Sequence, residues 1–239
     1  MGKSKYKRVL LKLSGESFCK HGGFGIDRGS LESISKRITE ICALGPQVAV
    51  VVGAGNFLRG ESFSEISGIP RNTADYMGML ATIINACALQ ETLEKLGQPT
   101  RVLSAIDVSA MCEPFIRRRA LRHLERGRVA ILAGGTGNPF FTTDTCAALR
   151  ATELDAELLI KATKVDGVYS ADPEKDPDAK LFDRLHYSDV FKNDLRVMDH
   201  SAVSLCSDNG IAIIVLNIFK EGNITKAVCG EQVGTYIGP

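Results

Sequence analysis

The sequence predicts an α/β fold, a three-layer αβα sandwich around a mainly parallel sheet. Short apolar runs with the composition of buried strands alternate along the chain with segments of helical periodicity, which is the pattern of a parallel sheet between helices. Three of these runs end in glycine-rich loops. At 239 residues and 44% hydrophobic content, the chain is long enough to bury a large core, and we expect a single domain with two lobes.

The charge and the cysteine content indicate which partners to expect. Lysine and arginine total 29 against 28 acidic residues, so the net charge of +1 provides no field that would attract nucleic acid or an anionic membrane. No apolar stretch reaches the roughly 18 residues of a membrane span. The basic start of the chain lacks the apolar core of a signal peptide. The seven cysteines are widely spaced and form no C-x-x-C pair, as in reduced cytosolic proteins, so we expect a cytoplasmic protein.

The first predicted strand, residues 9–13, carries a lysine within an apolar run and ends at Ser14 and Gly15. Burying an ammonium group costs free energy unless the group reaches an opposite charge. Lys12 is therefore a candidate phosphate contact, with the serine and the glycine allowing the backbone to approach. An edge strand with Lys12 in water explains the pattern equally well.

A second strand with a glycine-rich end follows the first helix. Apolar residues at helical spacing predict a helix over residues 31–41, which a Gly-Pro pair ends. The apolar run at residues 48–52 then leads into G-A-G-N at residues 53–56 and, a turn later, into Arg59. The guanidinium group of an arginine suits bidentate contact with phosphate.

A long helix is predicted over residues 72–96, which contain no proline. Its apolar residues cover more than one face, so we expect it to pack against several elements or against another subunit. Asp75 lies in the predicted first turn, where a carboxylate interacts favourably with the helix dipole; this structural role competes equally with a ligand contact. After a short strand at residues 101–104, arginines surround a helix that contains Leu121, which indicates a solvated face or a subunit contact.

The chain is organised around the loop at residues 133–144, A-G-G-T-G-N-P-F-F-T-T-D. The loop connects a predicted buried strand at residues 129–132 to a helix that includes residues 146–149. Backbone N–H groups and hydroxyls at such a strand end suit an anionic ligand. A tight turn that binds nothing is the alternative for this loop taken alone.

A second lysine-bearing strand follows. Residues 157–163 form an apolar run with Lys161 near its end, and a turn-rich segment reaches residue 177. A helix at residues 201–207, a strand at residues 211–216 and a final segment around residues 235–237 complete the chain.

Together these features are a strong signal for a polyphosphate site. Three glycine-rich strand ends and two strand lysines, Lys12 and Lys161, belong to the edge of the sheet where open α/β folds bind ligands. The common nucleotide-binding fingerprints are absent, because no glycine precedes Lys-Ser or Lys-Thr at P-loop spacing and no G-x-G-x-x-G occurs. The four histidines are scattered and support neither a zinc site nor a hydrolase triad.

The motifs of this chain, taken in order, resemble those of bacterial uridylate (UMP) kinases of the amino-acid-kinase superfamily, and the resemblance covers nearly the whole chain. Residues 75–82 and 135–144 are specific to the UMP kinase branch, whereas the first motif and the glycine-rich turns are shared with other amino-acid kinases. The motifs are K-L-S-G-E (12–16), G-F-G-I-D (23–27), G-A-G-N-F-L-R-G (53–60), D-Y-M-G-M-L-A-T (75–82), G-T-G-N-P-F-F-T-T-D (135–144), K-A-T-K-V-D-G-V-Y (161–169), A-D-P (171–173) and V-M-D (197–199).

The resemblance implies Mg²⁺-dependent transfer of the γ-phosphoryl group of ATP to UMP, giving UDP and ADP in pyrimidine nucleotide biosynthesis. Lys12 and Lys161 would face the phosphoryl group and Asp144 would orient lysine and magnesium, with Asp199 a weaker candidate for a similar role. Mg²⁺ would be held through the nucleotide phosphates, with Asp144 as the candidate protein contact. The residues implied for ATP are Lys12, Leu13, Ser14, Gly15, Gly55, Arg59, Thr163, Tyr169 and Asp172. Those implied for UMP are Ala54, Asp75, Thr136, Gly137, Asn138, Pro139, Phe140, Phe141, Thr142 and Thr143.

The resemblance also implies assembly and regulation. The family forms homohexamers, and many members are activated by GTP and inhibited by UTP. Residues 1–155 would form the UMP-binding and oligomerisation lobe and residues 156–239 the ATP-binding lobe. The family usually has glycine where Ala54 stands, and the methyl group would cost energy if the backbone there required a positive φ. The stretch implied for GTP is Lys20, His21, Gly22, Gly23, Phe24 and Gly25.

Other classes of function compete with this interpretation. Another enzyme of the superfamily would phosphorylate a carboxylate or a carbamate, but its acceptor site would need a fork for an amino acid or carbamate, and T-G-N-P-F-F-T-T-D argues against one. A non-catalytic nucleotide-binding or oxyanion-storing protein could dispense with Lys12 and Lys161, yet both are present. A third alternative, in which every glycine-rich loop is only a tight turn, does not explain two lysines in buried strands.

Overall fold

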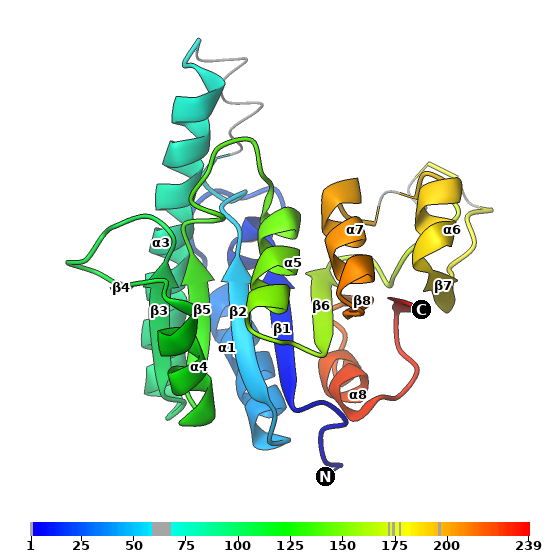
Figure 1. The fold of residues 1–239 in the computed structure, drawn as a ribbon, viewed down its shortest axis with the longest axis horizontal. Coiled ribbons are helices and arrows are strands. Elements are labelled where there is room, and N and C mark those ends of the chain that lie inside the picture. Colours follow the sequence, from blue (N-terminus) through cyan, green and yellow to red (C-terminus); the bar gives the residue numbers. More distant parts are fainter. Residues whose placement is uncertain (1, 59–67, 172, 174, 177, 196) are drawn as a thin grey trace.

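The computed structural model describes residues 2–58, 68–171, 173, 175–176, 178–195 and 197–239. Within them the chain forms one nine-stranded sheet between two layers of helices, which confirms the predicted α/β fold (Figure 1). The strands lie in the order β4-β3-β5-β2-β1-β6-β8-β9-β7. Neighbouring strands are parallel except β8 and β9, which are antiparallel. The first strand of the chain is therefore a central strand of the sheet, between β2 and β6.

The strands follow the apolar runs of the sequence, and each strand that the sequence predicts forms within one residue of its expected bounds. Three strands were not predicted as strands. β4 and β7 have two and three residues, too few to show a period, and β9 was expected only as a final segment. The bounds are β1 Arg8–Leu13, β2 Gln47–Val52, β3 Thr100–Ser104, β4 Glu113–Pro114, β5 Val129–Ala133, β6 Leu158–Thr163, β7 Arg184–His186, β8 Ala212–Asn217 and β9 Thr235–Gly238.

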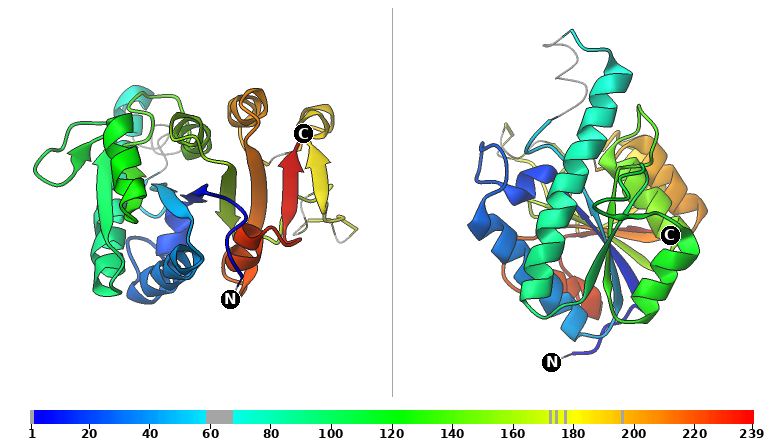
Figure 2. Two further views of the ribbon diagram at one scale, coloured as in Figure 1. Left: turned by 60° about the horizontal axis from the view of Figure 1, so that its bottom comes forward. Right: turned by 90° about the vertical axis from the view of Figure 1, so that its left-hand side faces the viewer.

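The helices cover both faces of the sheet. Apolar residues of α1, α3 and α8 join one core cluster, and those of α4, α5, α6 and α7 join the other, so the sheet lies between two apolar layers (Figure 2). The short helices α6 and α8 escaped prediction. The bounds are η1, one turn of 3₁₀ helix, Gly15–Phe18, α1 Arg28–Ala43, α3 Arg71–Lys95, α4 Arg117–Glu125, α5 Thr143–Glu153, α6 Tyr187–Lys192, α7 His200–Asp208 and α8 Asn223–Cys229.

The alternation of side chains along β1 supplies both core layers and one charge. Val9, Leu11 and Leu13 belong to the layer of α1, α3 and α8, whereas Leu10 belongs to the opposite layer with α5 and α7. Lys12 shares the face of Leu10, because residues two apart on a strand point the same way. It is only 8% exposed. The alternative of an edge strand with Lys12 in water is therefore wrong.

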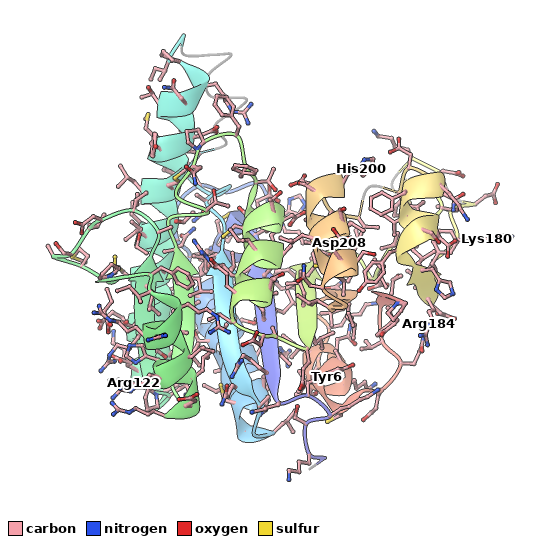
Figure 3. The ribbon with its side chains drawn as sticks, in the orientation of Figure 1. Tyr6, Arg122, Lys180, Arg184, His200 and Asp208 are labelled. Atoms are coloured by element: carbon pink, nitrogen blue, oxygen red, sulfur yellow. The ribbon has the colours of Figure 1, made fainter. Side chains whose placement is uncertain are left out.

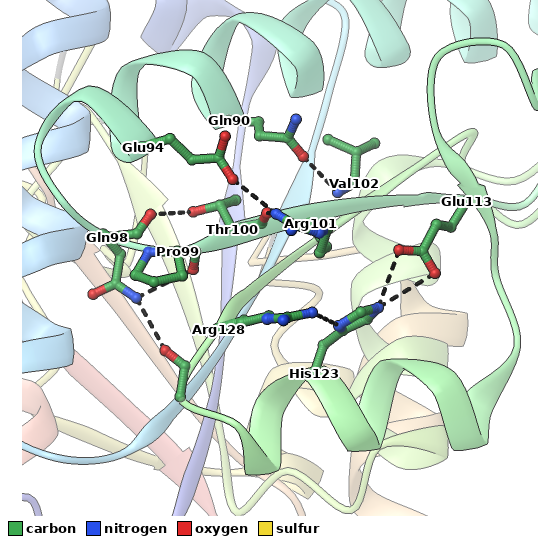
Figure 4. A network of polar contacts seen from close by, with 11 residues as sticks. Gln90, Glu94, Gln98, Pro99, Thr100, Arg101, Val102, Glu113, His123 and Arg128 are labelled. Atoms are coloured by element: carbon green, nitrogen blue, oxygen red, sulfur yellow. Dashed lines mark hydrogen bonds and ion pairs between the residues drawn. The ribbon is translucent and has the colours of Figure 1, made fainter.

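Polar contacts fasten the β3 and β4 end of the sheet to its helices (Figure 4). On α3, Gln90 Oε1 accepts a hydrogen bond from the backbone N–H of Val102 at 3.0 Å. On α4, the buried His123 contacts Glu113 through Nε2 at 3.2 Å and Arg128 through Nδ1 at 3.1 Å. Because an arginine only donates, Nδ1 is the acceptor and Nε2 carries the hydrogen towards Glu113.

The arginines around α4 are partly engaged within the chain. Arg117 forms an ion pair with Asp155 at 2.5 Å, and Arg119 lies 3.6 Å from Glu113. Arg122 is exposed near the end of α4 (Figure 3). This arrangement is consistent with a solvated face.

The long helix α3 has one buried and one exposed apolar side. Leu89 and Leu93 are fully buried in the core, whereas Tyr76, Leu80 and Ile84 are about half exposed. The predicted breadth of the apolar surface is confirmed, and within this chain part of it faces outward. No helix in the described ranges is both long and apolar enough to cross a membrane.

Candidate active site

A cavity of about 460 Å³ opens at the carboxyl ends of the central strands. Its wall comes from five segments of the chain: the end of β1 with the turn after it, the turn after β2, one face of α3, the loop that leads from β5 into α5, and the start of α7. Open α/β sheets bind ligands in this position. The lining residues are Lys12, Ser14, Gly15, Glu16, Gly53, Ala54, Gly55, Leu58, Arg71, Asp75, Gly78, Met79, Thr82, Gly135, Thr136, Phe141, Thr142, Thr143, Asp144 and Asp199.

Two lysines stand side by side because β1 and β6 pair in parallel with Lys12 opposite Lys161, and of the two Lys12 lines the cavity. Register partners in adjacent strands point to the same face, so both ammonium groups reach the start of α5. Asp144 lies between them, with Oδ1 2.8 Å from Lys12 Nζ and Oδ2 2.8 Å from Lys161 Nζ. We call these three residues the lysine–carboxylate triad. It is largely buried and carries one surplus positive charge.

Burial and attraction oppose each other in the triad. Burial alone would raise the pKa of Asp144, but the two ammonium groups outweigh burial and hold this pKa below its ordinary value. The pKa of Lys161 is lowered, first by burial and then by repulsion from Lys12, against the attraction of Asp144. The carboxylate is therefore ionised at neutral pH and holds Lys12 at the wall of the cavity and Lys161 directly behind it.

The start of α5 fixes the position of Asp144. Thr142 is the N-cap, and its Oγ1 accepts hydrogen bonds from the backbone N–H groups of Asp144 at 3.1 Å and Thr145 at 3.3 Å. A carboxylate in the first turn is also favoured by the helix dipole. Asp199 accepts hydrogen bonds from Thr142 Oγ1 and, at 3.1 Å, from Thr145 Oγ1. Asp199 thus fixes Thr142, the N-cap residue that positions Asp144. The negative charge of Asp199 also attracts the ammonium group of Lys161.

The turns after β1 and β2 touch each other at the cavity. A Cβ on Gly15 would lie 2.2 Å from the backbone nitrogen of Gly55, so only glycine permits this approach. Gly53 N–H donates to the carbonyl of Leu13 at 2.9 Å. The backbone of Ala54 does not have a positive φ. Its methyl group therefore carries no conformational penalty, and the alanine fits this turn.

Asp75 occupies a position that differs from the predicted one. Helix α3 begins at Arg71, so Asp75 lies beyond the first turn, and the expectation of a first-turn dipole contact is wrong. Its carboxylate instead pairs with Arg71, whose Nε lies 2.9 Å from Oδ1, and its Oδ2 accepts from the backbone N–H of Phe140 at 2.8 Å. Phe140 has a positive φ of 69°. Asp75 therefore fastens the loop after β5 to helix α3.

The structure brings many of the residues implied by the resemblance together and leaves others apart. Leu13 is fully buried in the core and does not line the cavity. The other residues implied for catalysis, ATP or UMP that are in the described ranges and do not line the cavity are Gly137, Asn138, Pro139, Phe140, Lys161, Thr163 and Tyr169. Arg59 and Asp172 lie outside the described residues. Those that line the cavity are Lys12, Ser14, Gly15, Ala54, Gly55, Asp75, Thr136, Phe141, Thr142, Thr143 and Asp144.

One side of the cavity was missed by sequence reasoning. Arg71, Gly78, Met79 and Thr82 line it from α3 together with Asp75. Spacings of three and four residues place these positions on one face of a helix. The signal that could have identified these residues was their helical spacing from Asp75, which places them on the same face of α3 as a candidate ligand contact. Leu58, Glu16 and Gly135 also line the cavity without having been singled out as ligand residues.

The carboxylates of Asp144, within the triad, and of Asp199, next to it, suit a metal ion that is bound mainly through the phosphates of a ligand. Within the described ranges, no group of three or more His, Cys, Asp or Glu side chains could hold a metal ion. Asp144 Oδ1 accepts no hydrogen bond besides its ion pair with Lys12, and Asp199 lines the same cavity. This donor set fits Mg²⁺, which is commonly bound through phosphates and one or two carboxylates.

Comparison with known proteins identifies similar chains over nearly the full length. Residues 7–217 match the model of the amino acid kinase family. The structure is similar to a UMP kinase from Bacillus anthracis, with 39% identity, a TM-score of 0.94 and coverage of 98% of this chain and 96% of the other. A UMP kinase from Ureaplasma parvum has 34% identity and a TM-score of 0.91 over the whole of both chains. A uridylate kinase from Archaeoglobus fulgidus has 32% identity and a TM-score of 0.75, over 97% of this chain and 100% of the other.

Removing the carboxylate of the triad should damage the fold more than removing one lysine. Asp144→Asn leaves two buried ammonium groups without a counter-charge, and we expect it to lower the free energy of unfolding by about 3–5 kcal/mol. Lys161→Met leaves Lys12 and Asp144 as a one-to-one pair, so we expect less than half that loss. Urea denaturation of both variants measures the order. Equal losses, or a greater loss for Lys161→Met, would contradict this balance of charges.

The lowered pKa of Asp144 predicts a triad that is labile in acid. The folded pKa lies below the unfolded value of about 3.9. The ionised carboxylate therefore contributes stability that is present above the unfolded pKa and lost as pH falls through the folded pKa. Below about pH 4, we expect the free energy of unfolding to fall more steeply in the wild type than in Asp144→Asn. Parallel curves in denaturation experiments across this range would show that Asp144 is not held ionised by the fold.

Proposed function

Because the chain belongs to the amino acid kinase family, we propose that it is a nucleoside monophosphate kinase that transfers the γ-phosphoryl group of ATP to UMP, giving UDP and ADP. The observation that carries this proposal is the lysine–carboxylate triad at the wall of a cavity that the loop after β5 also lines. Similarity to two UMP kinases and a uridylate kinase at 32–39% identity supports UMP as the acceptor.

In this mechanism the triad stabilises charge and transfers no proton. The phosphate of UMP has a second pKa near ~6, so it is largely dianionic at neutral pH and needs no general base. One of its oxygens bonds to the γ-phosphorus as the bond to the bridging oxygen breaks, and ADP leaves with that electron pair. The barrier comes from bringing two polyanions together and from the charge spread over the moving phosphoryl group. Lys12 and Lys161 supply positive charge there, and Asp144 fixes their positions.

Magnesium would complement the two lysines. Mg²⁺, when bound, would neutralise part of the charge of the nucleotide phosphates. Asp144 and Asp199 are the protein groups that would hold it beside the phosphates. Asp144 therefore has two tasks, which are to orient the lysines and to share a cation with the substrate.

On the acceptor side, we assign Asp75 to the ribose hydroxyls and the loop from Thr136 to Thr143 to uracil and its phosphate. Asp75 lines the cavity and bonds to that loop through the N–H of Phe140, so one side chain would sense both ribose and loop position. An ionised carboxylate can accept about four hydrogen bonds, which leaves capacity for a hydroxyl beside the contacts with Arg71 and Phe140. We assign Ala54 to the UMP phosphate.

On the donor side, we assign Ser14, Gly15 and Gly55 to the phosphates of ATP, and Thr163 and Tyr169 to its adenosine. Arg59 and Asp172 complete the assignment from outside the described residues. On the family resemblance, residues 1–155 form the lobe for UMP binding and oligomerisation and residues 156–239 the lobe for ATP binding, with the phosphates of ATP reaching the turns of the first lobe. The triad then stands where the lobes meet, since Lys12 and Asp144 come from the first lobe and Lys161 from the second.

Assembly and regulation are proposed on the family resemblance. We propose a homohexamer in the cytoplasm, activated by GTP at residues 20–25 and inhibited by UTP, acting in pyrimidine nucleotide biosynthesis. The exposed apolar side of α3, with Tyr76, Leu80 and Ile84, supports association with further subunits because large apolar patches on a protein surface mark interaction sites.

The proposed activity is tested with a panel of acceptors. ADP formation from ATP and Mg²⁺ is measured with UMP, CMP, dUMP, acetylglutamate, aspartate and carbamate, each with and without GTP. We expect selective turnover of UMP. Preference for a carboxylate or carbamate would instead place the chain with other enzymes of the superfamily. Tight ATP binding without turnover of any acceptor would favour a nucleotide-binding or storage protein.

Removal of the β1 ammonium group should abolish most of the turnover. Lys12→Ala is expected to lower kcat for UMP by on the order of 10²-fold or more while leaving the assembly intact, because a preorganised donor to the transition state is lost. Lys36→Ala, an exposed lysine on α1, is the matched control and should keep wild-type rates. Near-normal turnover of Lys12→Ala would show that the phosphate site lies elsewhere.

Loss of the carboxylate on α3 should weaken the acceptor selectively. Asp75→Ala is expected to raise KM for UMP about 10- to 100-fold, the effect of losing a hydrogen bond to a charged group, with little change in KM for ATP. Asp107→Ala, which removes an exposed carboxylate outside the cavity, serves as the control. If KM for ATP alone rises, the two subsites are assigned the wrong way round.

A further inference from the structure

Two asparagines form a buried pair behind the wall of the cavity. Asn85 lies on α3 and is 0% exposed, and Asn56 follows the glycine turn after β2 and is 1% exposed. Neither lines the cavity, whereas Gly53, Ala54 and Gly55, which directly precede Asn56 in the chain, do. The pair is therefore placed to act on a ligand only through that turn.

All the amide hydrogens of this pair are used. Asn85 Nδ2 donates to the carbonyl of Gly53 at 2.8 Å and to Asn56 Oδ1 at 2.8 Å. Asn56 Nδ2 donates to Asn85 Oδ1 at 3.0 Å and to the carbonyl of Gly25 at 2.8 Å. The Gly25 N–H in turn donates to the Asn56 carbonyl at 2.9 Å. Because backbone carbonyls only accept, the orientation of both amides is fixed.

The contacts join three segments: helix α3, the turn after β2 and the segment around Gly25. Asn85 anchors the turn of residues 53–55 to a long helix, and Asn56 anchors the segment around Gly25 to the same turn. About one helical turn before Asn85, Thr82 Oγ1 accepts a hydrogen bond from the backbone N–H of Gly134 at 2.8 Å. Gly134 lies at the start of the loop after β5. One face of α3 thus holds two of the three glycine loops of the cavity.

A fully satisfied buried amide pair resists displacement. Removing one partner leaves carbonyl and amide groups buried without hydrogen bonds, which is unfavourable for each group. The turn is also wedged against Gly15, where even a Cβ would clash with the nitrogen of Gly55. A shift of the turn by a fraction of an ångström would therefore also change the turn after β1.

We propose that Asn56 and Asn85 are positioning residues that set the turn at residues 53–55 relative to the lysine–carboxylate triad. This inference rests on the proposed function for its kinetic consequence, since that turn is assigned to the phosphates of both nucleotides. Its structural consequence does not depend on the substrate. Misplacement of a reactant by about 1 Å can lower a rate on the order of 10²-fold.

The structural consequence is tested by hydrogen exchange on the whole chain without substrates. In Asn85→Ala, we expect faster exchange in peptides that cover residues 22–27 and 53–57, and unchanged exchange at residues 100–104. Gln90→Ala is the matched control, because it removes an amide contact from the same helix to Val102 on β3, away from the cavity (Figure 4). It should accelerate exchange at residues 100–104 only. Unchanged exchange at residues 53–57 in Asn85→Ala would overturn the proposal.

The kinetic consequence is tested with the same proteins and with Asn56→Ala, which cuts the pair from the side of the turn if Asn85→Ala does not fold. Rates are taken well below the melting temperature of every variant. We expect kcat/KM for UMP to fall at least about 10-fold in each asparagine variant and to stay near wild type in Gln90→Ala. The double variant should lose little more than either single one, because the pair acts as a unit.

The outcomes separate this proposal from the proposed function. If the wild type does not phosphorylate UMP but Asn85→Ala shows the expected exchange pattern, the function is wrong and the positioning role of the pair stands. If the wild type is active and the asparagine variants lose only as much activity as a variant of equal melting temperature, the pair is merely structural and the proposal fails.

Discussion

The shared carboxylate between two lysines is the interaction on which this structure depends. Lys12 and Lys161 are register partners on adjacent strands, so their ammonium groups lie close together, and Asp144 pairs with both of them. Lys161 Nζ also donates to the carbonyl of Val197. The carboxylate in turn needs the N-cap of α5 to hold it. Strand order, helix placement and cap chemistry therefore converge on one surplus positive charge at the carboxyl edge of the sheet.

The surplus charge links stability to function. Burial disfavours an uncompensated cation, so the surplus charge of the triad has an electrostatic cost that a polyanionic substrate would relieve. Any ligand that binds the folded chain alone also stabilises it. The surplus positive charge destabilises the folded chain, and the same charge would attract phosphate and stabilise the transferring phosphoryl group.

The sequence predicted the parts of this arrangement that have a local cause. The long strands follow from apolar runs, and the two lysines stood out because an ammonium group in a buried strand needs a partner. Asp144 was identified only through the resemblance, since the pairing of β1 with β6 is set by strand order and is invisible locally. Asp75 was placed in the wrong turn because the helix starts at Arg71. Asn85 gave no signal, because an asparagine within a helix reveals its burial only when the strands beside it are known.

The most direct measurement of the central claim is a crystal structure of the chain with ADP, UMP, Mg²⁺ and aluminium fluoride as an analogue of the transferring phosphoryl group. The account predicts the analogue in line between the two nucleotides, within hydrogen-bonding distance of Nζ of both Lys12 and Lys161, with Asp144 still between the lysines. An analogue bound away from both ammonium groups, or a triad that separates when the site fills, would contradict it.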